Sequence, residues 1–304
     1  MVIAFIEGLL FAPRSFAQKF LVWALSPLGK LAAFWQWKKL NAKKPVDLEI
    51  RVVSVGNLTI GGSGKTPLIV ALAKRFDKAA IVLRGYGRKS RDLIVLDDQS
   101  AVCDVGDEAL LYRSLLERAI IIVSTDRKAG VLKAKELGAK VVFLDDGFRH
   151  REIKKFDVLI RPFPEPLNHR VLPAGCYRLP LKAYDLADFI AKEGEDFARK
   201  CEVSNPTDRM VLVTAISRAK RLDPFLPSGI VAKYAFRDHA VFDVETLKAI
   251  AKKHNADSLL VTRKDLVKLE NFSAIALSVL ELEMIVSDRL LMAIDDYYKK
   301  ASNF

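Results

Sequence analysis

Runs of apolar residues alternate with stretches of helical spacing through the first two thirds of the chain. Consecutive apolar residues, typical of buried strands, occur at 50–55, 79–83, 119–123 and 140–144. Apolar residues repeat at three- and four-residue intervals, as on one face of a helix, at 68–74, 109–116 and 128–137. Strands that alternate with helices predict a mostly parallel sheet with helices on both faces. We therefore expect an α/β domain over residues 46–195, with a short edge strand at 93–96.

The last third of the chain predicts a second, smaller α/β domain, for which we expect the bounds 205–304. Strand-like runs lie at 210–215, 230–236, 258–261 and 274–279, and helical spacing appears at 244–254 and 283–299. The proline-rich stretch 161–180 indicates irregular chain over the surface. Residues 192–208 are charged and rich in turn-forming residues, and we expect them to link the two domains.

Large apolar and aromatic side chains, including all three tryptophans, crowd residues 1–37. Charged residues and prolines interrupt this stretch, so it lacks the run of about 20 apolar residues that a spanning helix needs. We also expect no removed signal peptide here. Residues 1–45 instead predict amphipathic helices followed by a lysine-rich tail. Two compatible interpretations stay open: the helices lie in the headgroup region of an anionic membrane, or they pack on the globular domain as a hairpin.

The charge balance restricts the partners. A formal net charge of +12 indicates an anionic partner, which could be nucleic acid, an acidic membrane surface or a phosphorylated substrate. Because no basic helix with interleaved base-reading side chains and no zinc spacing appears, we expect no nucleic-acid partner. The three cysteines are widely spaced, which argues against a disulfide framework and favours a reducing compartment.

A glycine-rich turn separates the first predicted strand from the first predicted helix. It reads Thr59-Ile60-Gly61-Gly62-Ser63-Gly64-Lys65-Thr66. A strand, a glycine-rich loop ending in Gly-Lys-Thr and a helix wrap backbone N–H groups around the phosphates of a nucleotide. Lys65 can reach the β- and γ-phosphates, and the Thr66 hydroxyl can bind Mg²⁺. Thr59 departs from the pattern, since glycine is usual at that position.

Two adjacent carboxylates, Asp145 and Asp146, end the strand predicted at 140–144. Downstream of a phosphate-binding loop, a carboxylate in this position holds Mg²⁺ directly or through water. Two buried carboxylates repel one another unless a cation or a proton is present, so a metal ion is the simplest explanation. The alternative is a capped turn.

Other polar residues follow predicted strands or open predicted helices. Arg84 and Tyr86 follow the strand at 79–83, at the sheet edge where ligands of open α/β sheets gather, although a glycine turn with solvated arginines would look the same. Asp107 opens a predicted helix, where helix capping alone would explain an acidic residue. His239 follows a predicted strand, where a histidine is commonly structural.

Taken together, the chain resembles the tetraacyldisaccharide 4'-kinase family, the lipid A 4'-kinases. The matching motifs run in family order over about residues 50 to 265: Ser54-Val55-Gly56-Asn57-Leu58-Thr59, Arg84-Gly85-Tyr86, Gly106-Asp107-Glu108, Asp145-Asp146-Gly147-Phe148, His150, Leu172-Pro173-Ala174-Gly175, Asp238-His239 and Lys264-Asp265. The sequence departs from the family at Arg149, where Gln is common, and at Leu179, where Glu is usual.

The resemblance implies ATP- and Mg²⁺-dependent phosphorylation of the 4'-hydroxyl of an acylated diglucosamine 1-phosphate. It implies a site at the cytoplasmic face of the inner membrane of Gram-negative bacteria. By the same resemblance Asp107 is the base on the sugar hydroxyl, with His239 as its partner. Lys65 and Arg178 would offset charge on the transferring phosphoryl group, and His150 would lie near the substrate or the phosphates.

A different class of protein would share the phosphate-binding loop. A membrane-attached ATPase or GTPase switch also binds Mg-nucleotide, but it hydrolyses the nucleotide without a lipid acceptor. Such a switch has no need of Asp107 or His239. The sequence predicts no oligomeric state.

Overall fold

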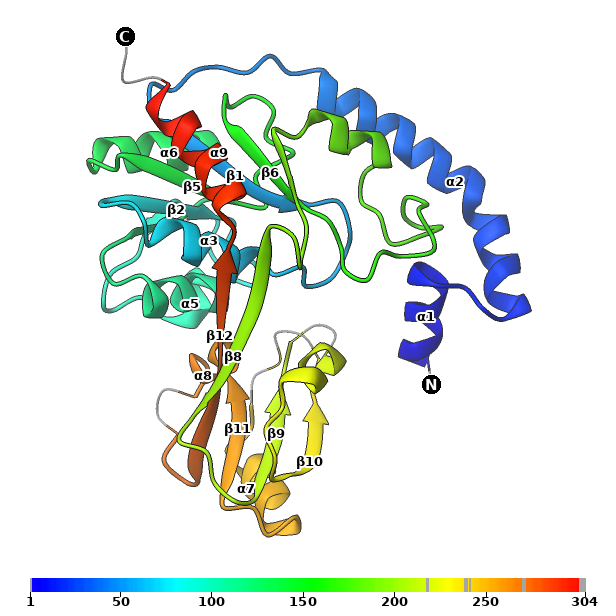
Figure 1. The fold of residues 1–304 in the computed structure, drawn as a ribbon, viewed down its shortest axis with the longest axis vertical. Helices are drawn as coiled ribbons and strands as arrows, with labels where there is room; N and C mark the ends of the chain where they lie inside the picture. Colours follow the sequence, from blue (N-terminus) through cyan, green and yellow to red (C-terminus); the bar gives the residue numbers. More distant parts are fainter. Residues whose placement is uncertain (1, 217–218, 238–239, 241, 270–271, 301–304) are drawn as a thin grey trace.

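The computed structural model describes residues 2–216, 219–237, 240, 242–269 and 272–300 of the 304-residue chain. It contains two β-sheets, one above the other in Figure 1, with a helical arm at the side. The expected α/β architecture of two units is therefore confirmed. The first unit is built on the larger sheet and the second unit on the smaller one.

The larger sheet has seven strands in the order β3-β4-β2-β5-β1-β6-β7. The strands are β1 (Arg51–Asn57), β2 (Ala79–Leu83), β3 (Ile94–Val95), β4 (Ile120–Val123), β5 (Val141–Asp145), β6 (Phe156–Ile160) and β7 (Phe189–Ala191). All pair in parallel except β3, which is antiparallel to β4. The apolar runs predicted β1, β2, β4 and β5 because their residues are almost all buried on both faces.

Helices cover both faces of this sheet. The helices are α3 (Lys65–Ala73), α4 (Val102–Val105), α5 (Asp107–Leu115), α6 (Arg127–Glu136) and α9 (Asp288–Lys299). Side chains of α3, α5 and α9 share one apolar core with the sheet, and α6 contributes to the core on the opposite face. Because β1 and β5 are adjacent and parallel, the loops that leave their carboxyl ends lie at the same edge of the sheet.

The smaller sheet has five strands in the order β10-β9-β11-β12-β8. The strands are β8 (Phe197–Ser204), β9 (Met210–Thr214), β10 (Ile230–Ala235), β11 (Ser258–Thr262) and β12 (Ala276–Val286). Around this sheet lie α7 (Val244–Lys253), α8 (Arg263–Leu266) and the 3₁₀ turn η2 (Ala219–Phe225), and the turn η1 (Leu181–Leu186) precedes β7. The core under α7 is separate from the cores of the larger sheet.

An antiparallel ribbon of β8 and β12 joins the two sheets (Figure 1). Its register runs from Val279 opposite Ser204 to Val286 opposite Phe197. The expectation of a linker over residues 192–208 is wrong for residues 197–204, which form β8. Apolar and polar residues alternate along β8, and one face of the strand is exposed, so its composition imitates a linker.

The C-terminal helix α9 belongs to the core of the larger sheet rather than the smaller one. Leu290 and Ile294 are buried in that core, and the Tyr298 ring lies 5.2 Å from the Phe76 ring. The helix also begins later than the expected 283–299, because the preceding residues continue β12. The predicted domain 205–304 therefore contributes its last helix to the first sheet.

The helical arm consists of α1 (Val2–Phe11) and α2 (Phe16–Asn41), at the right of Figure 1. Ser15 caps α2 by accepting from the Gln18 N–H at 3.2 Å, and the Gln18 side chain accepts from the Ser15 N–H at the same distance. One side of α2 packs on an apolar core that includes Leu40, Leu58 and Tyr177. The packed-hairpin interpretation is thus correct for that side of the helix.

Candidate nucleotide and phosphoryl-transfer site

The glycine-rich loop lies at the carboxyl end of β1, between that strand and the start of α3. Gly64 precedes the helix with φ +86°, a left-handed conformation that glycine adopts without steric cost. The first N–H groups of α3 have no partner within the helix, so they are available to an anion at this end. The local geometry is that of a phosphate-binding loop.

Asn57 brings two cationic side chains together beside this loop. Its Oδ1 atom accepts from Lys65 Nζ at 3.2 Å and from Arg178 Nη2 at 2.7 Å. Its Nδ2 atom donates to the Thr59 carbonyl oxygen at 2.9 Å. The predicted cations Lys65 and Arg178 therefore both bind Asn57, which places two positive charges side by side where a phosphate group could bind.

The two carboxylates after β5 lie in different environments. Arg178 holds Asp146 through two hydrogen bonds, whereas Asp145 accepts from the buried Tyr112 hydroxyl at 3.1 Å. Burial, and then the nearby Glu108, raise the pKa of Asp145 to about 7. Burial also opposes ionisation of Asp146, but Lys65 and Arg178 outweigh it and lower the pKa of that carboxyl.

A divalent cation fits beside Asp145. The Oδ1 atom of Asp145 is buried and has no hydrogen-bond partner, and a positive charge there would favour the ionised carboxylate. In the part of the chain that the structure describes, no group of three or more His, Cys, Asp or Glu residues could hold a metal ion. Mg²⁺ in nucleotide sites commonly takes one or two carboxylates, with water and phosphate oxygens as its other ligands.

A cavity of about 260 Å³ lies between the glycine-rich loop and the second sheet. Cationic side chains from both units line it: Lys65, Arg199, Arg221, Arg263 and Lys264. Arg221, in η2, donates to the Gly62 carbonyl oxygen and, at 2.9 Å, to the Phe163 carbonyl oxygen. The second unit therefore contacts the phosphate-binding loop directly and adds positive charge around it.

Asp107 begins α5 and is buried, with 5% of its surface exposed. Its neighbour Glu108 lines the same cavity as Lys65 and Thr66, so the start of α5 borders the phosphate-binding loop. Asp107 forms ion pairs with Lys268 at 3.5 Å and with Lys264 at 3.8 Å. His239, its expected partner, lies outside the described residues.

The turn after β2 packs against the turn that precedes Asp107. A Cβ atom placed on Gly106 would lie 2.9 Å from the Tyr86 carbonyl oxygen. The Arg84 side chain is exposed, and the Tyr86 ring is 66% exposed. Both residues are thus accessible to a ligand beside the start of α5.

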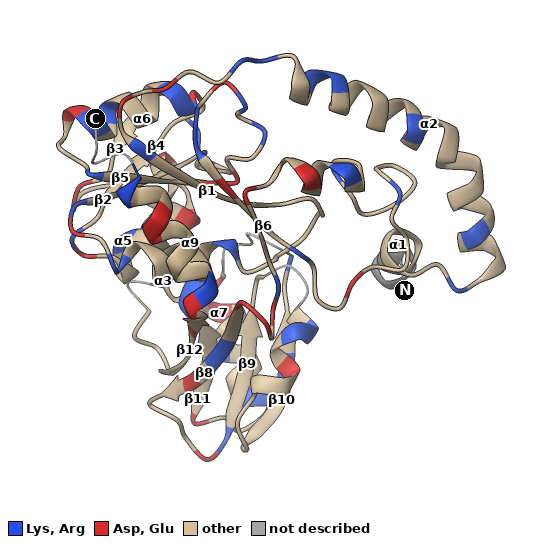
Figure 2. Cartoon of the chain, turned by 45° about the horizontal axis from the view of Figure 1, so that its top comes forward, with Lys and Arg blue, Asp and Glu red and all other residues tan. Residues whose placement is uncertain are grey.

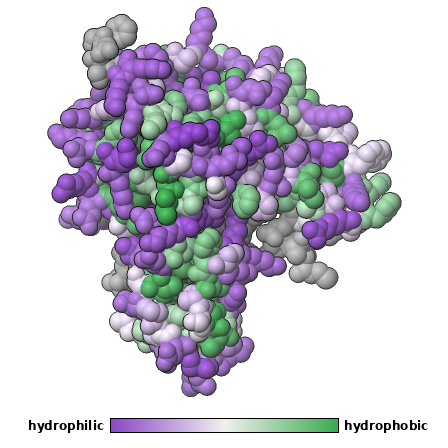
Figure 3. All heavy atoms as spheres, viewed as in Figure 1, coloured by the Kyte–Doolittle hydropathy of each residue, from purple (hydrophilic) through white to green (hydrophobic). Residues whose placement is uncertain are grey.

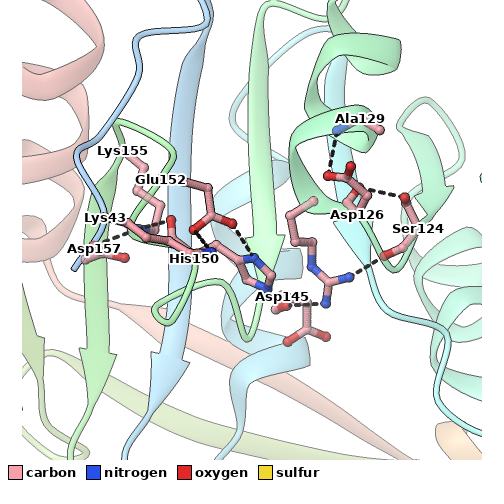
Figure 4. A network of polar contacts seen from close by, with 10 residues as sticks. Lys43, Ser124, Asp126, Ala129, Asp145, His150, Glu152, Lys155 and Asp157 are labelled. Carbon is pink, nitrogen blue, oxygen red and sulfur yellow. Dashed lines mark hydrogen bonds and ion pairs between the residues drawn. The ribbon is translucent and has the colours of Figure 1, made fainter. Parts of the chain in front are cut away.

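His150 belongs to a network that joins the turn after β5 to the chain before β1 (Figure 4). Its Nδ1 atom lies 3.0 Å from Glu152, which also pairs with Lys43 at 3.0 Å. Burial lowers the pKa of His150 despite the neighbouring Glu152 carboxylate. These contacts give His150 a structural role, and its expected place near substrate or phosphate stays a prediction.

The sequence assigned no individual role to several polar residues of the site, although two of them, Asn57 and Glu108, lie in the family motifs; the others are Tyr112, Arg221 and Lys268. Tyr112 lies in a helical stretch, where it looks like an ordinary core residue. Arg221 reaches the loop from another sheet, and no local pattern indicates such a contact. Asn57 ends a buried strand, and a polar residue at that position is a signal that could have been used together with its motif.

Comparisons with known proteins agree with this geometry. The family model for Tetraacyldisaccharide-1-P 4'-kinase matches residues 18–226 and 198–299. A Tetraacyldisaccharide 4'-kinase of Helicobacter pylori is 43% identical over 297 residues, which is 96% of this chain and 94% of the relative. The enzyme of that name from Campylobacter jejuni is 43% identical over 301 residues, 97% of this chain and 96% of the relative.

A solved structure is also similar. The crystal structure of the "apo" form of LpxK from Aquifex aeolicus in complex with ATP superposes with a TM-score of 0.73 at 25% sequence identity. The match covers 91% of this chain and 99% of that one.

Proposed function

Since this chain belongs to the tetraacyldisaccharide-1-P 4'-kinase family, we propose that it is an ATP-dependent lipid kinase with an acylated diglucosamine 1-phosphate as its acceptor. The product would be the 1,4'-bisphosphorylated precursor of lipid A. One observation carries the proposal beyond family membership: the phosphate-binding loop and the start of α5 border one cavity. A phosphate donor and a basic carboxylate can therefore meet there.

The reaction follows from the positions of the side chains. The main chain of residues 61–66 would bind the triphosphate, and Lys65 and Arg178 would offset charge on the transferring group. The oxygen of the 4'-hydroxyl would bond to the γ-phosphorus as the bond from that phosphorus to the bridging oxygen of ADP breaks. The hydroxyl proton would pass to the Asp107 carboxylate, with His239 as the proposed partner of that base.

Thr66 and one of the two carboxylates, Asp145 and Asp146, would hold Mg²⁺. When bound, this ion would neutralise charge on the β- and γ-phosphate oxygens. Asp146 is already engaged by Arg178, and the buried Oδ1 atom of Asp145 has no partner. That contrast favours Asp145 as the direct ligand.

We also propose that the protein binds the anionic leaflet at the cytoplasmic face of the inner membrane through α2. Among the described residues, no helix combines the length and apolar content that crossing a bilayer requires. Opposite its packed side, α2 exposes large apolar residues: Phe16, Phe20, Trp23, Leu31 and Phe34. Figure 2 shows basic but no acidic residues along α2, and Figure 3 shows apolar side chains at the surface where α2 lies. Aromatic rings beside lysines suit the headgroup region of such a leaflet.

Transfer of labelled γ-phosphate from ATP to a disaccharide 1-phosphate lipid in detergent tests the kinase proposal. We expect the wild type to label the lipid, and we expect Lys65→Ala and Asp107→Ala to lose most of that rate. Asp104→Ala, which changes an exposed carboxylate near Asp107 in the sequence, should keep it. Hydrolysis of ATP without labelled lipid would favour a nucleotide switch, and full transfer by Asp107→Ala would remove that residue as the base.

A further inference from the structure

The Asp107 carboxylate lies on the first unit, but its counter-charges come from the second. Lys268 Nζ lies 3.5 Å from Asp107 Oδ2, and Lys264 Nζ lies 3.8 Å from the same oxygen. The side chains of Asp107 and Lys268 are each only 6% exposed, so water screens this pair weakly. The contact is therefore a buried meeting point between the two units.

Lys264 lies on the short helix α8 and Lys268 lies in the turn that follows it, and Asp265 fixes this segment on the smaller sheet. This carboxylate is fully buried and accepts from the Thr214 hydroxyl at 2.7 Å and from the Ala215 N–H at 3.0 Å. Thr262, which caps α8, also donates to it at 2.7 Å. Because residues at the ends of β9 and β11 both hold Asp265, α8 and the turn after it present Lys264 and Lys268 from a fixed position.

Lys268 is held on its own side of the contact as well. Its ammonium group donates to the Ala240 carbonyl oxygen at 3.4 Å and lies 3.9 Å from Asp265 Oδ1. Its position over the Phe242 ring, at 5.8 Å from the centroid, restricts it further. The ammonium group is thus placed before it meets Asp107.

We propose that Lys264 and Lys268 are positioning residues of the phosphoryl transfer, which hold the Asp107 carboxylate ionised and in place as the acceptor of the hydroxyl proton. The inference rests on the proposed function. A buried carboxylate without a counter-charge takes up a proton, and a protonated Asp107 cannot accept another. The base is therefore complete only where α8 of the second unit contacts the start of α5.

Two other carboxylates at this contact compete with Asp107 for the charge of the lysines. Glu108, on the same helix as Asp107, lies 3.8 Å from Lys264 and competes for its charge. Asp265 competes for Lys268, at the longer distance of 3.9 Å. Lys268 has the shorter distance to Asp107 and the more buried side chain, so its removal should have the larger effect.

The pH dependence of lipid phosphorylation by the full chain in detergent tests this inference. We expect Lys268→Met to lower kcat roughly tenfold or more, which is part of the roughly 100-fold or more that proton transfer contributes, with less than about a twofold change in the KM for ATP. The acidic limb of its profile of kcat against pH should move to higher pH, because loss of a cation favours the neutral carboxylic acid. Lys268→Arg keeps the charge and should recover part of the rate.

Lys248→Met is the matched control. Lys248 lies in the second unit, like Lys268, and it also pairs with a carboxylate, but its partner Glu245, at 2.8 Å, lies at the surface of the same unit. It should leave both kcat and the pH profile unchanged. If Lys268→Met does not fold, Lys264→Met, with a more exposed side chain, should show the same shift in smaller measure. A folded Lys268→Met with the wild-type pH profile, or an unchanged profile in Lys264→Met, would overturn the inference. Wild-type protein that labels no lipid would instead overturn the proposed function, and this inference with it.

Discussion

Arg178 binds Asp146 through both of its terminal nitrogens, with Nη1 2.8 Å from Oδ2 and Nη2 3.1 Å from Oδ1. The same Nη2 atom lies 2.7 Å from Asn57 Oδ1. A planar guanidinium group can make these contacts at once, whereas a lysine ammonium group acts as a point charge. The pair therefore fixes the carboxylate next to the phosphate-binding loop by geometry as well as by charge.

Arg178→Lys tests the importance of that geometry. We expect it to lower kcat by roughly 10- to 100-fold although the charge is kept, because an ammonium group cannot reproduce the two parallel hydrogen bonds. Steady-state phosphorylation of the lipid at saturating ATP measures this loss. Arg149→Lys keeps the charge near Asp146 and changes an arginine that donates to the Arg178 carbonyl oxygen at 3.3 Å, so it should have little effect. Equal rates for Arg178→Lys and the wild type would show that charge alone suffices.

Asp145 should make the metal-free protein less stable as the pH rises. The carboxyl has an ordinary pKa of 3.8 and a pKa of about 7 in the folded protein, so between these values the folded state binds more protons than the unfolded chain. The free energy of unfolding therefore falls as the pH increases through this range. Asp145→Asn removes this contribution and keeps an acceptor for Tyr112.

Urea unfolding with a chelator present, at pH 5 and pH 8, measures the effect. The stability advantage of Asp145→Asn over the wild type should be larger at pH 8. The increase should be a few kcal/mol, since one pKa unit corresponds to about 1.4 kcal/mol. The exposed Asp104→Asn should show no such difference. Parallel pH dependences for wild type and Asp145→Asn would contradict the prediction.

Gly106→Ala should lower the rate of phosphoryl transfer by shifting the backbone just before Asp107. Gly106 has φ +87° and lies so close to the Tyr86 carbonyl oxygen that an added Cβ must displace the turn before Asp107. Gly138→Ala is the matched control, because Gly138 has φ +80° and open space around its added Cβ. Both changes should cost about 1–3 kcal/mol of unfolding free energy because of the positive φ, but only Gly106→Ala should also lower kcat. Comparable kcat values for the two variants would contradict this.

The exposed aromatic side of α2 should control membrane binding. Phe20 and Trp23 lie side by side, with ring centroids 5.9 Å apart. Replacing both by serine should reduce sedimentation with anionic liposomes roughly tenfold or more, because each large side chain gains about 1.5–3 kcal/mol on full burial. Leu132→Ser with Met292→Ser removes exposed apolar surface from α6 and α9 and should leave binding unchanged. Equal sedimentation of the two double variants would argue against α2 as the anchor.

Much of the fold can be predicted from local sequence patterns. The predictions that are wrong concern elements whose structure or position depends on contacts distant in sequence. The strands β1, β2, β4 and β5 are buried on both faces, so their apolar runs identify them. β8 has an exposed face and pairs with a strand some 80 residues later, so only tertiary structure shows that it is a strand. The amphipathic pattern of α9 predicts burial but does not indicate which sheet covers it.

The candidate site likewise contains residues that a local sequence pattern indicates and residues that only the tertiary structure reveals. The loop at 59–66 and the Asp145–Asp146 pair carry their chemistry in adjacent residues, and a sequence pattern can therefore indicate them. Arg221 and Lys268 act from the second unit, which reaches the loop through contacts distant in sequence, such as the pairing of β8 with β12. His150 differs from both groups, since its motif indicates a site residue and its contacts with Glu152 and Lys155 hold a turn, so its place near substrate or phosphate stays a prediction.

The path of the chain after β12 affects how the protein must be synthesised. A ribosome releases α9 only after it has made the whole smaller sheet, so the face of the larger sheet that receives Leu290 and Ile294 stays open to solvent during most of translation. A truncation that ends within the smaller sheet would leave that apolar face uncovered and prone to aggregation. Residues 46–195 expressed alone would leave the same apolar face uncovered.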